Sequence, residues 1–178
     1  MNKKILLGVS ASISAYKACD LITDLKNAGF DVRVAMTKDA HHFITPLALQ
    51  SFSGNEVFSD FFSLPGRITP VHIELARTSD LVLVAPASAD IIAKLAHGFA
   101  DDILSCTVLA SDKPLVIAPA MNEKMYENKI TQGNLKRLTD LGAKIAPPIR
   151  GHLVCSQEGM GHLAENKTIL DVVRNCVF

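Results

Sequence analysis

The feature that most constrains the fold is a succession of short apolar runs, each followed by residues of helical character. The runs are apolar at consecutive positions, which is typical of strands buried on both faces of a parallel sheet. After the first run, apolar residues from Ile13 and Tyr16 to Leu25 recur every three or four positions, and Ala28 and Gly29 end the predicted helix. Strands that alternate with helices predict an α/β fold with a doubly wound parallel sheet and helices on both faces. The expected strands are residues 4–9, 31–36, 81–85, 115–118 and 144–146.

Length and composition restrict the possible functions. The 178 residues form most simply one domain, residues 1–178, which buries about 70% of its unfolded surface. Lys+Arg and Asp+Glu both number 18, without a block of like charge, so neither nucleic acid nor a membrane surface is an expected partner. The apolar runs fall far short of the ~20 residues of a membrane span, and no signal peptide is expected. Four cysteines without C-x-x-C spacing predict reduced thiols, no metal site and a cytoplasmic location.

Polar or reactive residues follow the expected strands. In a parallel α/β sheet, ligands bind beyond the carboxyl ends of the strands. The residues placed there are Ser10, Thr37, Ser88, Asn122 and Cys155, and we expect them to converge on one rim. The loop of residues 53–71 is long enough to suggest a function or an interface.

Two strand-to-helix junctions have the composition of a phosphate site. Residues 8–14 are small or hydroxylated, so backbone N–H groups and serine hydroxyls can surround an anion at a helix N-terminus. The dinucleotide fingerprint G-x-G-x-x-G is absent, so a mononucleotide such as FMN fits better than NAD. Residues 86–90 repeat the pattern, with Ser88 as a candidate ligand. A plainer interpretation of both segments is a serine N-cap, with Asp90 favoured by the helix dipole alone.

Three residues on separate loops carry chemistry suited to an enzyme. Cys155 lies among glycines and polar neighbours, so we interpret it as a partly exposed thiol on a segment that can move. His72 can titrate near neutrality and act as a base or orient a carboxylate. Asn122 offers donors and an acceptor to a substrate carboxylate or amide. The alternatives are a buried small cysteine, one non-catalytic histidine among six, and an asparagine that only caps a helix.

Together these segments resemble the homo-oligomeric flavin-containing cysteine decarboxylase family. The similarity runs from residue 4 to about residue 164, and five segments carry it in order: 8–17, 72–73, 86–90, 119–126 and 151–161. Many members have Asn where this chain has Asp90, and an aromatic residue, often Trp, at the position of Tyr126. The resemblance implies a Rossmann-like (flavodoxin-like) fold with a flap at about residues 148–164, and it is strongest for the branch of the family that serves coenzyme A biosynthesis.

The resemblance implies an FMN-dependent decarboxylation of 4′-phosphopantothenoyl-L-cysteine to 4′-phosphopantetheine and CO2. The cysteine end of the substrate would be oxidised, CO2 loss would leave an enethiolate, and the electrons would then return. His72 would assist the oxidative decarboxylation, Asn122 and Met125 would hold the substrate, and Cys155 on the flap would supply a proton. The residues that the resemblance implies for FMN binding are Gly8, Ser10, Ala11, Ser12, Ile13, Thr37, Ser88, Ala89, Asp90, Ile91 and Ala120.

The resemblance also implies a homotrimer or a multiple of one, with the flavin at a subunit boundary, so that His72 serves a neighbouring subunit. Bacterial relatives are often fused to a synthetase, and because the chain ends at Phe178 a free-standing decarboxylase is expected. Three alternatives stay open: an oxidative decarboxylase of a peptide's C-terminal cysteine, a regulatory flavoprotein without turnover, and a binding module without flavin. The flap cysteine favours the coenzyme A reaction, since a proton donor is needed only if the enethiolate is reduced.

Overall fold

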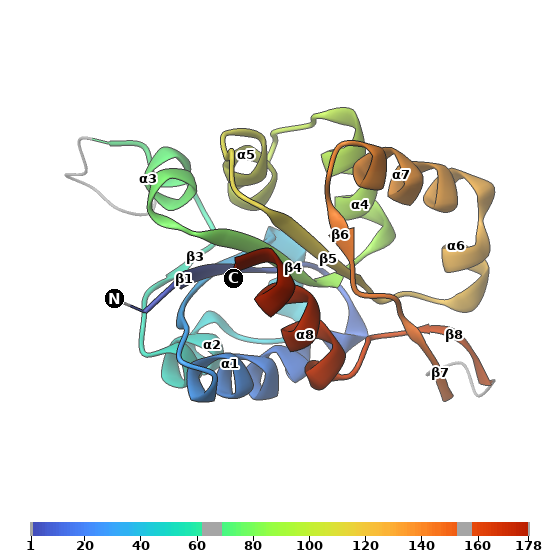
Figure 1. Ribbon diagram of the computed structural model, residues 1–178, viewed down its shortest axis with the longest axis horizontal. Helices are drawn as coiled ribbons and strands as arrows, with labels where there is room; N and C mark the ends of the chain where they lie inside the picture. Colours follow the sequence, from blue (N-terminus) through green and yellow to red (C-terminus); the bar gives the residue numbers. More distant parts are fainter. Residues whose placement is uncertain (1, 62–68, 153–157, 178) are drawn as a thin grey trace.

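The core of the protein is a parallel sheet, seen in a computed structural model that describes residues 2–61, 69–152 and 158–177. Its six strands lie in the order β3-β2-β1-β4-β5-β6 (Figure 1). The strand order reverses between β1 and β4, as in doubly wound nucleotide-binding sheets. The predicted doubly wound α/β fold is therefore confirmed. The strands are β1 (Lys4–Val9), β2 (Asp31–Met36), β3 (Val57–Phe58), β4 (Leu81–Ala87), β5 (Leu115–Pro119) and β6 (Lys144–Ile145).

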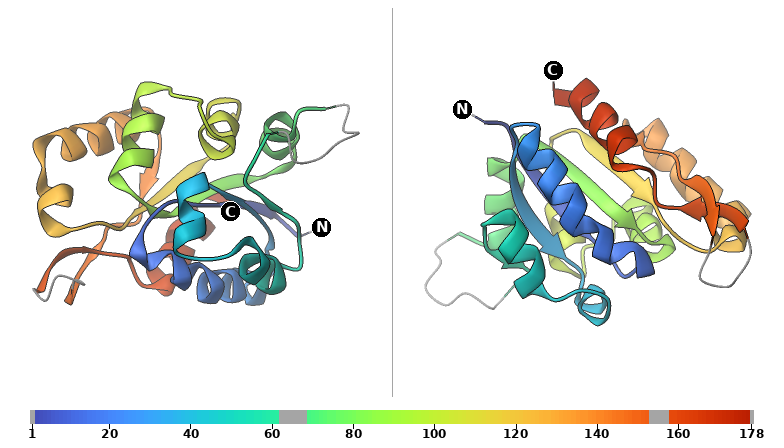
Figure 2. Two further views of the ribbon diagram at one scale, coloured as in Figure 1. Left: turned by 180° about the vertical axis from the view of Figure 1, so that it is seen from behind. Right: turned by 90° about the horizontal axis from the view of Figure 1, so that it is seen from below.

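Helices cover both faces of the sheet (Figure 1). One face carries α1 (Ala18–Asn27), α2 (Pro46–Ser53) and α8 (Asn166–Val177), and a view from below shows α1 and α8 side by side (Figure 2). The other face carries α3 (Val71–Thr78), α4 (Ala89–His97), α5 (Ile103–Leu109) and α7 (Lys129–Asp140).

Two apolar clusters form the core, one on each face of the sheet. Successive residues of β1 alternate between them, with Ile5 and Leu7 in one cluster and Leu6 in the other. All seven residues of β4 are buried, because this strand lies between β1 and β5 and is covered by helices on both sides. Each such Leu or Val contributes about 1.5–3 kcal/mol by its burial, which holds the strand ends, and the loops that follow them, in fixed positions.

The first predicted helix differs from the observed one. A 3₁₀ helix, η1 (Ile13–Lys17), precedes α1, and the Ser12 side chain caps it by accepting from the N–H of Ser14. The tighter winding turns Ile13 and Tyr16 outward, with 56% and 59% of their surfaces exposed. The predicted helix is thus divided: its first turn is a separate 3₁₀ helix, and α1 begins at Ala18.

Two further segments differ from the predicted pattern. The sequence predicts a helix that opens at residues 37–39, where the chain forms a 3₁₀ helix, η2 (Lys38–His42), and α2 begins only at Pro46, capped by Thr45. The expected loop of residues 53–71 contains β3, and α3 begins at Val71. His72 therefore lies in the first turn of a helix.

The segment predicted as a flap contains an antiparallel hairpin. Strands β7 (Ile149–His152) and β8 (Glu158–His162) pair with each other, and β8 lies against α6 (Glu123–Glu127). Cys155 lies outside the described residues. Within the described parts of the chain, no helix is both long and apolar enough to cross a membrane.

Candidate functional site

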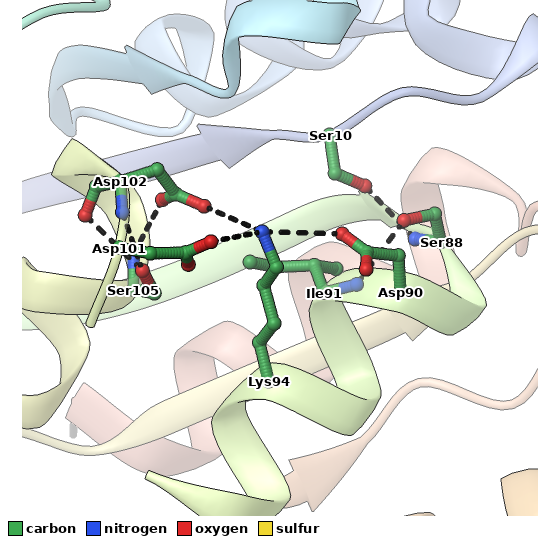
Figure 3. Close-up of polar contacts among 8 residues, drawn as sticks. All are labelled: Ser10, Ser88, Asp90, Ile91, Lys94, Asp101, Asp102 and Ser105. Carbon is green, nitrogen blue, oxygen red and sulfur yellow. Dashed lines mark hydrogen bonds and ion pairs between the residues drawn. The ribbon is translucent and has the colours of Figure 1, made fainter. Parts of the chain in front are cut away.

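The loops that follow β1 and β4 are joined by a buried serine. The Ser10 hydroxyl donates to the carbonyl oxygen of Pro86 at 2.7 Å and accepts from the N–H of Ser88 at 2.8 Å. Figure 3 shows Ser10 reaching across to Ser88. Ser10 is completely buried, and its one hydroxyl hydrogen is used within the protein. Ser10 therefore holds the start of α4 in place from beneath the site.

A second serine joins the loop after β1 to the loop after β5. Ser12 Oγ donates to the carbonyl oxygen of Ala120 at 3.2 Å, and the N–H of Ala120 bonds to the carbonyl oxygen of Ala87 at 3.0 Å. The structure thus brings three strand-end loops to one rim, as the strand pattern predicts.

A cleft of about 680 Å³ opens at this rim. This volume is in the range of small-molecule sites, about 300–1,000 Å³, and the lining is mostly apolar with a few hydroxyl and amide groups, as such sites require. Eight residues expected at the site line the cleft: Ala11, Ser12, Ile13, Ser88, Ala89, Ala120, Asn122 and Met125. Six further residues complete the lining: Ser14, Tyr16, Phe43, Met121, Gly161 and His162.

The start of α4 is suited to an anion. Ser88 is the N-cap, and its hydroxyl accepts from the N–H of Ile91 at 3.3 Å. The remaining N–H groups of the first turn point along the helix axis toward the rim, where the dipole favours negative charge. Ser88 and Ala89, which open this helix, line the cleft.

Thr37 carries a buried hydroxyl without a partner. Its N–H bonds to the carbonyl oxygen of Val9 at 3.0 Å, which fixes the residue at the end of β2. Its Oγ1 is inaccessible to solvent and makes no hydrogen bond among the described residues. Thr37 is not among the residues that line the cleft. An unpaired buried hydroxyl costs about 1–3 kcal/mol, so a hydrogen bond from this hydroxyl to a bound ligand would be favourable.

Two expected cofactor residues lie in the core and not at the cleft. Gly8 is within β1, and a Cβ atom there would lie 2.5 Å from Leu104 Cδ1, so the glycine allows α5 to pack closely on the strand. The Ile91 side chain is completely buried in the core on the α4 face, and its N–H donates to the hydroxyl of the N-cap Ser88. Packing explains both residues without a ligand.

Asp90 lies in the first turn of α4, with its side chain exposed and directed to Lys94 (Figure 3). Lys94 Nζ lies 3.6 Å from Asp90, 3.0 Å from Asp101 and 3.5 Å from Asp102. Burial opposes the charge of Lys94, but the hydrogen bond to Asp101 and the neighbouring carboxylates raise its pKa. The Asp90 carboxylate thus belongs to a surface ion-pair network and does not line the cleft.

His72 lies away from the cleft of its own chain. Its ring stands edge-on to Phe61, with 5.6 Å between centroids, and its Nδ1 is buried without a partner among the described residues. Both Figures 1 and 2 place α3 at the opposite end of the sheet from the β7–β8 hairpin. The structure does not bring His72 together with Asn122 within one chain.

The loop after β5 is clamped by strand β8. Asn122 is the N-cap of α6, with its Oδ1 accepting from the N–H of Lys124 at 2.9 Å. The next residue, Glu123, accepts from the N–H of Met160 at 3.0 Å, and the N–H of Met121 bonds to the carbonyl oxygen of Gly161 at 2.9 Å. The capping role anticipated as an alternative for Asn122 is therefore present, and Glu123 is an anchor that sequence reasoning missed.

Lys17 and His162 form a second contact that sequence reasoning missed. Lys17 Nζ lies 2.7 Å from His162 Nε2 and thereby joins η1 to β8 at the wall of the cleft. Burial, and then the charge of Lys17, lower the pKa of His162. The sequence places His162 in the expected flap, directly after Gly161, but does not indicate its contact with Lys17.

A second cavity, of about 670 Å³, lies at the opposite ends of the strands. Val82 and Leu115, near the starts of β4 and β5, line it together with the exposed Phe99 and Leu109. Ligands of doubly wound sheets bind beyond the carboxyl ends of the strands, so the first cleft is the candidate site.

The family model named Flavoprotein matches residues 1–178, and the chain belongs to this family. The probable phosphopantothenoylcysteine decarboxylase of Streptococcus mutans is 47% identical over 175 residues, which cover 97% of this chain and 98% of that protein. The bifunctional coenzyme A biosynthesis protein CoaBC of Vibrio vulnificus is 45% identical over 92% of this chain, but the match spans only 41% of that longer protein.

Solved structures show the same architecture. A PPC decarboxylase mutant complexed with pantothenoylaminoethenethiol superposes with a TM-score of 0.90 and 34% identity, and the match covers 98% of both chains. The FMN binding protein AtHal3 gives a TM-score of 0.83 and 35% identity over 98% of this chain and 96% of its own.

Proposed function

We propose that residues 1–178 act as one FMN-dependent decarboxylase domain, which converts 4′-phosphopantothenoyl-L-cysteine to 4′-phosphopantetheine and CO2 in coenzyme A biosynthesis. The observation that carries this proposal is a single cleft with two different walls. One wall is the anion-suited start of α4, and the other is the Asn122 and Met125 loop clamped by β8. The likeness to the Streptococcus mutans protein over nearly its whole length supports the same activity.

The described residues fit FMN. Ser88 and the first-turn N–H groups of α4 would hold its phosphate, the unpaired Thr37 hydroxyl would gain a partner, and the apolar walls suit a flat ring. When bound, FMN supplies a reversible two-electron acceptor for the thiol-bearing carbon of the substrate. Ser10 would act from below by positioning Ser88, while the side chains of Gly8, Asp90 and Ile91 would make no direct contact.

The other catalytic roles are divided among separate segments. Asn122 and Met125 would hold the cysteine end of the substrate, and the Cys155 thiol would protonate the enethiolate. Helix α3, which contains His72, lies at the opposite end of the sheet from the β7–β8 hairpin (Figures 1 and 2), and this supports a trimer, or a multiple of one, in which His72 completes a neighbour's site. We place the enzyme in the cytoplasm, and the unpaired state of the described cysteines Cys19, Cys106 and Cys176 is compatible with this.

Product analysis tests the function directly. Purified protein with FMN is incubated with 4′-phosphopantothenoyl-cysteine and, separately, with a peptide that ends in cysteine. We expect CO2 and a product with the mass of 4′-phosphopantetheine from the first substrate, and no reaction with the peptide. Turnover of the peptide alone would support the peptide decarboxylase, and turnover of neither substrate by flavin-loaded protein would refute both activities.

Two variants separate the half-reactions. His72→Asn should abolish CO2 release, whereas Cys155→Ser should still release CO2. A hydroxyl is a far poorer proton donor than a thiol with a pKa of about 8.5, so the Cys155→Ser product should be two hydrogens lighter than 4′-phosphopantetheine. If Cys155→Ser makes 4′-phosphopantetheine at the wild-type rate, the proton-donor role is wrong.

A further inference from the structure

The contact between Lys17 and His162 fixes the hydrogen-bonding state of both groups. An ammonium only donates, so His162 Nε2 accepts from Lys17 Nζ at 2.7 Å, and the neutral ring then carries its hydrogen on Nδ1. Burial and the charge of Lys17 lower the pKa of His162, which keeps the ring neutral at pH 7. The pair therefore offers N–H donors from two directions.

Among the described side chains, none supplies a counter-charge to Lys17. No carboxylate of the described residues lies within ion-pair distance of its Nζ, in contrast to Lys94 with its three aspartates. Lys17 also keeps two N–H donors beyond the one given to His162. The described residues that line the cleft include no Asp, Glu, Lys or Arg, so none of them neutralises this ammonium.

The position of the pair relates it to the substrate wall. His162 lines the cleft, and the residue before it, Gly161, bonds to the backbone of Met121, next to Asn122. A substrate held at Asn122 therefore lies on the same side of the cleft as the pair. The proposed substrate carries two oxyanions, a carboxylate and a phosphate, and charge-assisted hydrogen bonds to such groups are about twice as strong as neutral ones.

We propose that Lys17, positioned by His162, binds an oxyanion of the acidic substrate at this wall of the cleft. This inference rests on the proposed function and names a specificity group for it. Carboxylate and phosphate would be recognised by the same donors, and the choice between them is left to experiment.

The opposing explanation is a purely structural one, in which the Lys17–His162 bond only ties η1 to β8. Lys17→Gln distinguishes the two, because glutamine can still donate to His162 but carries no charge. Lys17→Arg keeps the charge and serves as the conservative rescue. Lys136→Gln on α7, where Lys136 pairs with Asp140 at 2.7 Å, is the matched control for loss of an unrelated lysine.

The assay is steady-state decarboxylation by flavin-loaded enzyme at equal FMN content, with 4′-phosphopantothenoyl-cysteine and with its unphosphorylated analogue, pantothenoyl-cysteine. Lys17→Gln should raise KM about 10- to 100-fold with kcat changed by less than about threefold, as for loss of a hydrogen bond to a charged group. Lys17→Arg should recover most of the affinity, and the control variant should behave as wild type.

The two substrates assign the oxyanion. A KM defect confined to the phosphorylated substrate identifies the phosphate, and an equal defect with both identifies the carboxylate. Unchanged KM values in Lys17→Gln, with normal wild-type turnover, overturn the inference and leave the proposed function intact. Wild-type protein that turns over neither substrate refutes the proposed function itself.

Calorimetry supplies a readout that does not depend on turnover. 4′-Phosphopantetheine carries the phosphate but no carboxylate, so it should bind Lys17→Gln about 10- to 100-fold more weakly if the phosphate is the partner. His162→Gln retains an acceptor for Lys17 and should bind nearly as wild type, whereas His162→Leu should show the Lys17→Gln defect. Wild-type affinity in His162→Leu would show that His162 does not position Lys17.

Discussion

Gly161 is the position where the smallest substitution should do the most damage. Its φ of +129° lies in the half of the backbone map that L-residues rarely adopt. A Cβ atom there would overlap the carbonyl oxygen of Met121 and approach its carbonyl carbon to 3.3 Å. The obstacle is backbone, which cannot rotate away, so the N–H of Met121 would have to separate from the carbonyl oxygen of Gly161.

The expected cost of Gly161→Ala follows from these two terms. An unfavourable φ costs about 1–3 kcal/mol, and the lost hydrogen bond costs about 0.5–1.5 kcal/mol, so the sum is about 3 kcal/mol. For a chain of this size, 1 kcal/mol lowers Tm by about 2–4 °C, which predicts a fall of about 6–12 °C. Because Asn122 follows Met121, decarboxylation should also fall, by about tenfold or more.

Gly142→Ala is the matched control. Gly142 has a φ of +100° at the exposed end of α7, and nothing lies within 4 Å of its Cβ position. It should carry the φ cost alone and retain normal activity. Thermal unfolding by circular dichroism and the decarboxylase assay measure both variants. Equal Tm shifts in the two variants, with normal turnover by Gly161→Ala, would refute the argument that the close backbone approach positions Asn122.

Three further predictions concern the ligand sites and pH. Thr37→Val should leave the stability of the flavin-free protein unchanged or raised, since its hydroxyl has no partner among the described residues. The variant should weaken FMN binding about 5- to 10-fold in a fluorescence titration, and unaltered affinity would remove Thr37 from the site. Asp90→Asn should change FMN affinity by less than about twofold and stability by less than about 1 kcal/mol, because the carboxylate is exposed and paired with Lys94; loss of flavin would contradict this. The pKa of His162 is lowered in the folded protein, so the unfolded chain binds a proton on this ring more readily. The contribution of His162 to stability is therefore complete above pH 6.5 and is lost as the pH falls below it. His162→Gln should flatten this pH dependence in urea unfolding measured from pH 7.5 to 5, and an unchanged slope would show that another group is responsible.

The sheet could be predicted from the sequence because a strand that is buried on both faces is apolar at consecutive positions. Strand β4 shows it best, since seven consecutive buried residues allow no amphipathic helix. Short elements contain too few residues to show such a pattern. Strand β3 has two residues, and its pairing with β2 at Val34 and Ala35 depends on the sheet that is already present. Helix η1 has only five residues, and its 3₁₀ winding after the Ser12 cap, which exposes Ile13, was likewise not apparent from the sequence.

The candidate site was predictable where a residue follows a strand and not where it depends on a distant partner. Ser88 and Asn122 follow β4 and β5, so the topology alone places them at the rim. Ser10 follows β1 in the same way, but its hydroxyl donates to the carbonyl oxygen of Pro86, 76 residues away. Ser10 was predicted to bind the cofactor, and this distant contact gives it a positioning role. Lys17 and His162 are separated by 145 positions, so no local pattern indicated their contact.

Strand β8 is attached at consecutive residues to two walls of the cleft, which the hydrogen bond from Ser12 to Ala120 also joins. Gly161 bonds to the loop after β5, and His162 bonds to the helix after β1. A ligand that binds only one arrangement of β8 at either attachment would select that arrangement at both. By thermodynamic reciprocity, occupancy of the η1 side would then change affinity at the Asn122 side by the same factor as the reverse. We therefore expect binding at the two walls to be coupled through this strand.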